Sequence, residues 1–206
     1  MGKLLSNFRN TILLSLVLAG VMIFAFGSVS PGGFDDLFWQ GVLRWTHVVA
    51  GILWIGLLYY FNFVQIRVMP AIPAELKPAV GKYIAPEALF WFRWSALVTV
   101  LAGLGVMFLR GHAYAAEVLT FGLAAGLTED QKGFTLMGIG VWLAIIMFLN
   151  VWGIIWPNQK RALGIVPAED DVKARATRVA MLASRTNTLL SLPMLTAMAM
   201  YQTLFG

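Results

Sequence analysis

The chain has 206 residues, of which 59% are hydrophobic and only 12% are charged. Soluble domains are about 45–50% apolar and about 25% charged. This chain carries too little charge to cover a soluble surface, which predicts one integral membrane domain over residues 1–206. The absence of cysteine excludes disulfides, thiolate metal sites and covalently attached c-type haem. Because most basic residues flank apolar stretches, the net charge of +5 indicates membrane topology and not nucleic-acid binding.

Apolar stretches long enough to cross a bilayer, which takes about 20 residues, occur five times. They cover residues 11–29, 41–64, 88–109, 134–156 and 186–205. The first stretch follows Lys3 and Arg9 and so has features of a signal peptide. The poor cleavage site after it favours an uncleaved anchor helix. The sequence therefore predicts an all-α bundle of five transmembrane helices.

Basic residues lie mainly on one side of these spans. The N-terminus, the loop between the second and third spans and the connection between the fourth and fifth hold 12 of the 15 lysines and arginines. Arg44, Arg110 and Lys132 are on the other side. The positive-inside rule then predicts a cytoplasmic N-terminus and an outer C-terminus. We expect a multi-pass protein of a bacterial inner membrane.

Two shorter segments lie outside the predicted spans. Residues 113–127 are apolar but too short to cross, which favours an outer interfacial helix or a re-entrant segment. Residues 167–171 place acidic side chains at a helix start, with Lys173, Arg175 and Arg178 after them. We expect a cytoplasmic amphipathic helix there that leads into the last span, which Pro193 is expected to kink.

The second span carries the densest set of polar groups. A single helical face would hold six residues, namely His47, Gly51, Trp54, Leu58, Asn62 and Gln65. An imidazole beside a glycine is typical of a haem-ligand site, because the glycine leaves room for a flat macrocycle. The alternative is a hydrogen-bonded packing histidine near the outer headgroups.

The second histidine, His112, follows the third span and is expected near the same outer face. It is either the other axial ligand of a haem b or an exposed loop residue. A small copper site with Met107 or Met22 is a weaker alternative. Arg44 and Arg110 flank this region. They would pair with haem propionates or simply reach the interface with their long side chains.

Further polar residues at membrane depth gather toward the inner side. Together they suggest an inner polar site made of Asn62, Gln65, Arg93, Asn150, Arg185 and Asn187. Charged and amide side chains within spans are costly, and they mark functional sites in many membrane proteins. The alternative is that the amides hold neighbouring helices together through hydrogen bonds.

Several sequence blocks resemble the membrane-embedded N-terminal domain of bacterial urate oxidase. They are residues 44–47 (RWTH), 54–64 (WIGLLYYFNFV), 92–94 (FRW), 150–160 (NVWGIIWPNQK) and 184–194 (SRTNTLLSLPM). The pattern His-x6-Trp-x-Gly-Leu-x-Tyr is also similar to that of HemJ-type protoporphyrinogen oxidases and CopD-like copper-resistance proteins. The resemblance implies a helical redox protein, with His47 as the leading haem ligand and Asn62, Arg93, Asn150, Arg185 and Asn187 as positions of interest.

Two functions are therefore expected. The first is a b-type haem protein that passes electrons to an outer-face carrier or a quinone. The second is a non-catalytic subunit of a larger membrane complex or a homo-oligomer, because the small residues at 102–105 and 138–140 allow close helix packing. A transporter is less favoured, because the spans lack a buried carboxylate relay.

Overall fold

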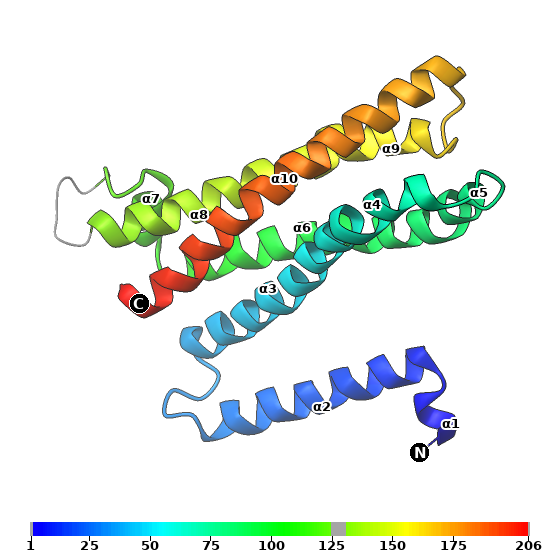
Figure 1. Ribbon diagram of the computed structural model, residues 1–206. Coiled ribbons are helices and arrows are strands. Elements are labelled where there is room, and N and C mark those ends of the chain that lie inside the picture. The colour runs from blue at the N-terminus through cyan, green and yellow to red at the C-terminus, as the bar shows by residue number, and fades with distance from the viewer. Residues whose placement is uncertain (1, 125–130, 206) are drawn as a thin grey trace.

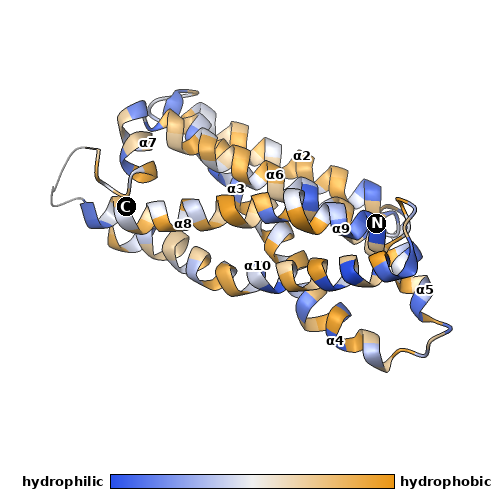
Figure 2. Ribbon diagram, turned by 90° about the horizontal axis from the view of Figure 1, so that it is seen from above, coloured by the Kyte–Doolittle hydropathy of each residue, from blue (hydrophilic) through white to orange (hydrophobic). Residues whose placement is uncertain are grey.

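The computed structural model describes residues 2–124 and 131–205, and every element within these two ranges is a helix (Figure 1). The prediction of an all-α fold is confirmed. The longest helices lie side by side as a bundle. Apolar residues dominate them, while hydrophilic residues gather mainly near their ends (Figure 2).

The chain begins with the short helix α1 (Gly2–Leu5), followed by the long helices α2 (Phe8–Val29) and α3 (Asp36–Tyr59). The π-helix η1 (Tyr60–Gln65), α4 (Ile66–Val68) and the 3₁₀-helix η2 (Met69–Ala71) extend α3. Next come α5 (Lys77–Ala79), the π-helix η3 (Val80–Ile84), α6 (Ala85–Leu109) and α7 (His112–Leu119). The rest consists of α8 (Gln131–Asn150), the π-helix η4 (Val151–Ile155), α9 (Trp156–Ala162) and α10 (Asp170–Leu204).

Four helical segments within the described residues are long and apolar enough to cross a membrane. They are Phe8–Val29, Asp36–Ala71, Lys77–Leu109 and Gln131–Ala162. Each contains one of the first four predicted spans. The fifth predicted span lies in α10, which is helical but less apolar, because amide and hydroxyl side chains follow one another along its buried face.

Side-chain caps fix where the first two long helices begin. The Asn7 side chain accepts a hydrogen bond from the Asn10 amide at 3.3 Å, and Asp35 Oδ1 accepts one from the Phe38 amide at 3.0 Å. Each of these side chains satisfies an amide that has no partner inside its helix. The first residues of α2 and α3 are therefore each fixed by a side-chain cap.

The bundle is built from two closely packed helix pairs, α3 with α6 and α8 with α10, while α2 lies to one side (Figure 1). Large side chains fill the core between the pairs, with Trp54, Leu58, Phe92 and Met147 at most 1% exposed. Helix α2 meets α3 mainly through the rings of Phe24, Phe34 and Phe38 near their turn. Most of its other apolar side chains are exposed, as expected for a helix that faces lipid.

The two segments predicted outside the spans agree in part with the structure. Helix α7 covers the first half of the predicted interfacial segment, and residues 125–127 lie outside the described residues. The amphipathic helix expected after residue 167 is the first part of α10, which begins with Asp170 and Asp171. Its first turns carry the ion pairs Lys173–Asp170 and Arg175–Asp171. The helix continues through Pro193 to Leu204.

Candidate functional site

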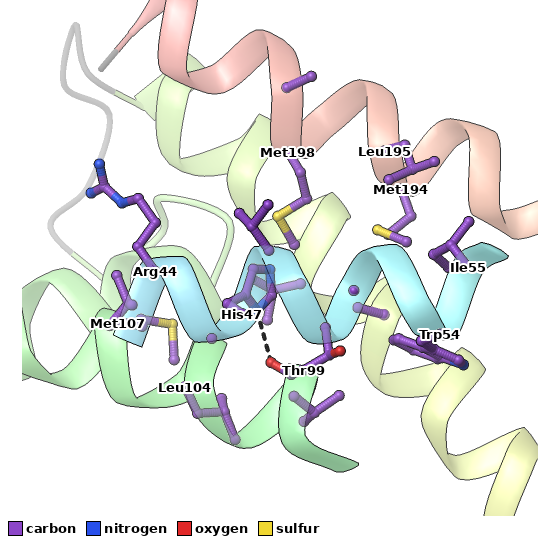
Figure 3. Close-up of a pocket in the computed structure, with 18 of the residues that line it drawn as sticks. Arg44, His47, Trp54, Ile55, Thr99, Leu104, Met107, Met194, Leu195 and Met198 are labelled. Carbon is purple, nitrogen blue, oxygen red and sulfur yellow. Dashed lines mark hydrogen bonds between the residues drawn. The ribbon is translucent and has the colours of Figure 1, made fainter. Parts of the chain in front are cut away.

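A cavity of about 640 Å³ lies in the half of the bundle where α3 begins and α10 ends, lined by α3, α6, α7, α8 and α10. Its wall is mostly apolar and includes Leu104, Met107, Ile55 and Leu195 (Figure 3). Cofactor and ligand pockets commonly measure about 300–1,000 Å³ and combine apolar walls with a few well-placed polar groups. This cavity has both properties, and its polar residues include Arg44, His47 and Arg110, which the sequence singled out.

His47 projects from α3 into this wall and is held by α6. Its Nδ1 lies 2.7 Å from the backbone carbonyl oxygen of Thr99. A carbonyl can only accept, so Nδ1 carries the hydrogen and donates it, and in the neutral imidazole this leaves the lone pair on Nε2. Metal-ligating histidines are typically held in this way, with one ring nitrogen bonded to a carbonyl and the other free for the metal.

Gly103 provides the space that the His47 ring occupies. A Cβ atom at Gly103 would lie 2.8 Å from His47 Nδ1 and 2.9 Å from its Cε1. At Gly51, which the sequence suggested as the point of close approach, a Cβ would make an ordinary 3.6 Å contact with Thr99 Cγ2. Gly51 does line the cavity. The glycine that the histidine requires is therefore the one on α6.

The end of the cavity near the start of α3 is basic. Arg44 and Arg110 both line it, and Figure 3 shows Arg44 one turn before His47 on α3. Arg110 places its guanidinium over the Tyr114 ring, 4.5 Å from the centroid, and donates to the Tyr114 hydroxyl at 3.1 Å. Within residues 2–124 and 131–205, no carboxylate forms an ion pair with either arginine. Both are open to an anionic group.

The second histidine is not part of this cavity. His112 is exposed at the start of α7, where its ring lies 5.9 Å from that of Phe108. The chain turns at Gly111, whose φ of +116° favours glycine, and α7 continues from there with Tyr114 lining the cavity instead. The described structure therefore does not bring the two histidines together.

Methionines form part of the cavity wall that the sequence did not predict. Met107, Met137, Met194 and Met198 line it from three helices. Met194 belongs to the apolar core and Met198 packs against it, whereas Met22 is exposed on α2 and does not line the cavity. Their spacing of four residues on α10 was the available signal. Within the described residues, no three His, Cys, Asp or Glu side chains gather as a metal site.

Two tyrosines, Tyr114 and Tyr201, form a hydrogen bond with each other next to Arg110. The Tyr114 hydroxyl donates to the Tyr201 hydroxyl at 3.1 Å while it accepts from Arg110. Burial, assisted by the hydrogen bond to Tyr201, raises the pKa of Tyr114 well above the ordinary value near 10. Tyr114 therefore remains a protonated donor at any physiological pH.

This shift predicts a pH dependence of stability at alkaline pH. A raised native pKa stabilises the fold below the pKa of the unfolded tyrosine, and this stabilisation is lost as pH rises toward the native pKa. The free energy of unfolding should therefore fall above about pH 10. In Tyr114→Phe that decrease should be smaller. Detergent unfolding between pH 9 and 11 measures it, and an equal decrease in both proteins would contradict the assignment.

In the other half of the bundle, amide side chains join three helices. Asn62 Nδ2 donates to the Leu58 carbonyl at 2.9 Å and to Ser184 Oγ at 2.8 Å. Asn150 Nδ2 donates to the Ala183 carbonyl at 2.9 Å and to Asn187 Oδ1 at 2.7 Å. Asn62, Asn150 and Asn187 therefore form one cluster around a single turn of α10.

The other predicted members of the inner site differ in their placement. Arg93 stacks its guanidinium on Trp156, 3.4 Å from the ring centroid, and Gln65 is half-buried at the end of η1. Arg185 is exposed on α10. Trp152, which sequence reasoning did not include, lies edge-on to Trp94 at 5.6 Å beside the cluster.

Asn187 should contribute most to stability among these amides, because it is fully buried and bridges α8 and α10. Its Nδ2 donates to the Met147 carbonyl at 3.0 Å, and its Oδ1 accepts from Asn150. Asn187→Ala should cost about 1–3 kcal/mol of unfolding free energy. Asn158→Ala removes only a bond to Ile154 in its own helical segment. Unfolding in mixed micelles should show a clearly smaller effect for this control; equal effects would contradict the bridge.

Comparison with known families concerns the C-terminal part of the chain. Residues 117–205 match the family model described as "Urate oxidase N-terminal". This part of the chain is similar to the urate oxidase N-terminal domain. The match includes the predicted blocks at 150–160 and 184–194, so the resemblance is confirmed there. The similarity to HemJ-type and CopD-like proteins remains a prediction.

The match to the urate oxidase N-terminal family covers a little under half of the chain. It contains Asn150, Asn187 and the methionines of α10, whereas His47 and Arg93 precede it. No curated protein and no solved structure matches the chain. The match therefore shows that residues 117–205 are similar to this family, and it assigns no activity.

Proposed function

We propose that this protein is a b-type haem protein that transfers electrons within the membrane, with His47 as an iron ligand. The observation that carries the proposal is the bond from His47 Nδ1 to the Thr99 carbonyl. It leaves Nε2 as the nitrogen available for a metal in a cavity that Figure 3 shows walled by apolar and thioether side chains.

The residues fit the parts of haem b in three respects. The apolar wall suits the macrocycle, and His47 suits the iron. Arg44 and Arg110 suit the propionates, because the planar guanidinium group can donate two hydrogen bonds to a carboxylate. Bound haem would supply a one-electron iron couple, whose potential the axial ligand and the burial set. The protein would orient the group and exclude water from it.

The proposal includes a membrane arrangement. We place the chain in the inner membrane of a bacterium as a five-span protein, with the N-terminus inside and α10 as the fifth span. The basic residues on the inner side favour this orientation. The cavity would then face the outer half of the bilayer, where an electron carrier or a quinone can reach it. Copper bound by His47 and Met107 is the weaker alternative.

Electron transfer is tested by reversible reduction. Purified protein incubated with haemin should show a Soret band that shifts on addition of dithionite and returns on reoxidation. If the protein binds haemin but the iron cannot be cycled, the electron-transfer part of the proposal fails while the cofactor part stands. If the spectrum is that of free haemin in detergent, both parts fail.

A further inference from the structure

The inner half of the bundle contains a layer of half-buried polar side chains whose hydrogen-bonding capacity is only partly used. We call it the inner polar layer and define it as Asn62, Gln65, Arg93, Asn150 and Trp152. Each has one buried polar atom without a partner in the described structure. These atoms are Asn62 Oδ1, Gln65 Oε1, Asn150 Oδ1, Arg93 Nε and Trp152 Nε1.

Contacts across the bundle place these groups at similar depth. Asn62 and Asn150 reach the same turn of α10, at Ser184 and Ala183. Trp152 of η4 packs against Trp94 of α6, the neighbour of Arg93. Phe61 and Phe92 pack edge-on at 5.6 Å and connect η1 with α6 at this depth. The members of the layer therefore come from three sides of the bundle, and α10 supplies hydrogen-bond partners on the fourth.

The orientation of the two amides is fixed by backbone carbonyls. Asn62 faces the Leu58 carbonyl and Asn150 faces the Ala183 carbonyl, at 2.9 Å in both cases. A carbonyl accepts only, so the NH₂ group of each amide must point at it. Neither amide can be reversed, and both Oδ1 atoms must remain free acceptors. Leaving such atoms without a partner at membrane depth is unfavourable.

The local backbone has an irregularity at the same positions. Asn62 lies within the π-helix η1, and Asn150 and Trp152 flank the start of the π-helix η4. Short π-helical turns within α-helices occur frequently at functional sites. Two such turns that contribute residues to one layer provide an indication of function that is independent of the unused hydrogen bonds.

The mixture of free groups determines what the layer can bind. A cation would satisfy the three amide oxygens but not the N–H groups of Arg93 and Trp152. An anion would satisfy the N–H groups and be repelled by the oxygens. We propose that the inner polar layer binds a small uncharged polar molecule that both donates and accepts hydrogen bonds, either ordered water or a neutral polar solute.

The site is separate from the outer cavity. None of the five residues of the inner polar layer lines that cavity. Leu58, which is fully buried, and Phe92, which is 1% exposed, belong to the apolar core that lies next to the layer. The inference therefore does not depend on haem, and its test needs no cofactor.

Pulsed X-ray hydroxyl-radical labelling of the whole protein in lipid nanodiscs tests this proposal, because bound water produces radicals beside buried side chains. Met147 is fully buried, and its carbonyl accepts from Asn187 within the amide cluster. Its oxidation should be readily detected in wild-type protein and fall at least about threefold in Asn62→Leu and in Trp152→Phe. Asn158→Leu, outside the layer, should leave it unchanged.

A second arm distinguishes water from a solute. Native mass spectrometry before dialysis should show a small neutral adduct, lost in Asn62→Leu, if a solute occupies the layer. Met147 should then be labelled only after dialysis. Labelling without an adduct identifies water. If Met147 stays unlabelled before and after dialysis and no adduct is seen, the proposal is wrong. Circular dichroism and gel filtration check that each variant is folded.

Discussion

His47→Ala should abolish haem binding, whereas His112→Ala should leave it intact. His47 is the histidine that lines the cavity, and its Nδ1 bond to Thr99 fixes the ring so that Nε2 can bind a metal. Removing even a group that orients a metal ligand typically costs 10–100-fold in affinity, so removing the ligand itself should cost more than about a hundredfold. Haemin titration followed at the Soret band measures both variants.

The His47→Ala substitution also permits a rescue experiment. His47→Ala leaves a gap beside Gly103 that free imidazole can enter, so added imidazole should restore part of the Soret band. This rescue would show that the loss comes from the missing ligand and not from misfolding. Retained haem binding in His47→Ala, or an equal loss in His112→Ala, would overturn the assignment of the ligand.

Gly103→Ala should disturb the same site without touching the histidine. The added Cβ would lie within 3.0 Å of two atoms of the His47 ring, so the ring must move away from Thr99. Overpacking of this kind costs about 1–3 kcal/mol of stability. Because the ring also loses its orientation, we expect haem affinity to fall about 10–100-fold.

Gly51→Ala is the matched control, because this glycine lines the same cavity. Its new Cβ would make a 3.6 Å contact with Thr99 Cγ2, and alanine favours the helix by about 1 kcal/mol over glycine. Haem affinity should stay near the wild-type value, and stability should be equal or higher. If the two variants behave alike in haemin titration and in unfolding, Gly103 does not position His47.

The sequence predicted the helical elements well, because long apolar stretches have few alternatives in a membrane. It also placed His47 and the inner amides correctly on helices that meet. It could not predict η1 and η4, because π-turns depend on how neighbouring helices pack. The stripe along the second span assumed a regular α-helix, which ends at Tyr59, before Asn62 and Gln65.

The partners of each polar side chain were also beyond sequence reasoning. Nothing in the sequence indicates that Thr99 offers its carbonyl to His47, or that Gly103 and not Gly51 provides the space. From the sequence, His112 was either a second axial ligand or an exposed loop residue, and the turn at Gly111 leaves it exposed. An apolar methionine suits lipid and core equally, and only the packing of α10 shows that Met194 and Met198 line the cavity.

The haem content of the wild-type protein tests the account most directly. Protein purified in mild detergent from haem-replete cells, or incubated with haemin and then freed of excess, should contain about one haem b per chain in a pyridine haemochromogen assay. Protein that remains without haem under both conditions, while folded and monodisperse, would contradict the proposed role of His47 and of the cavity around it.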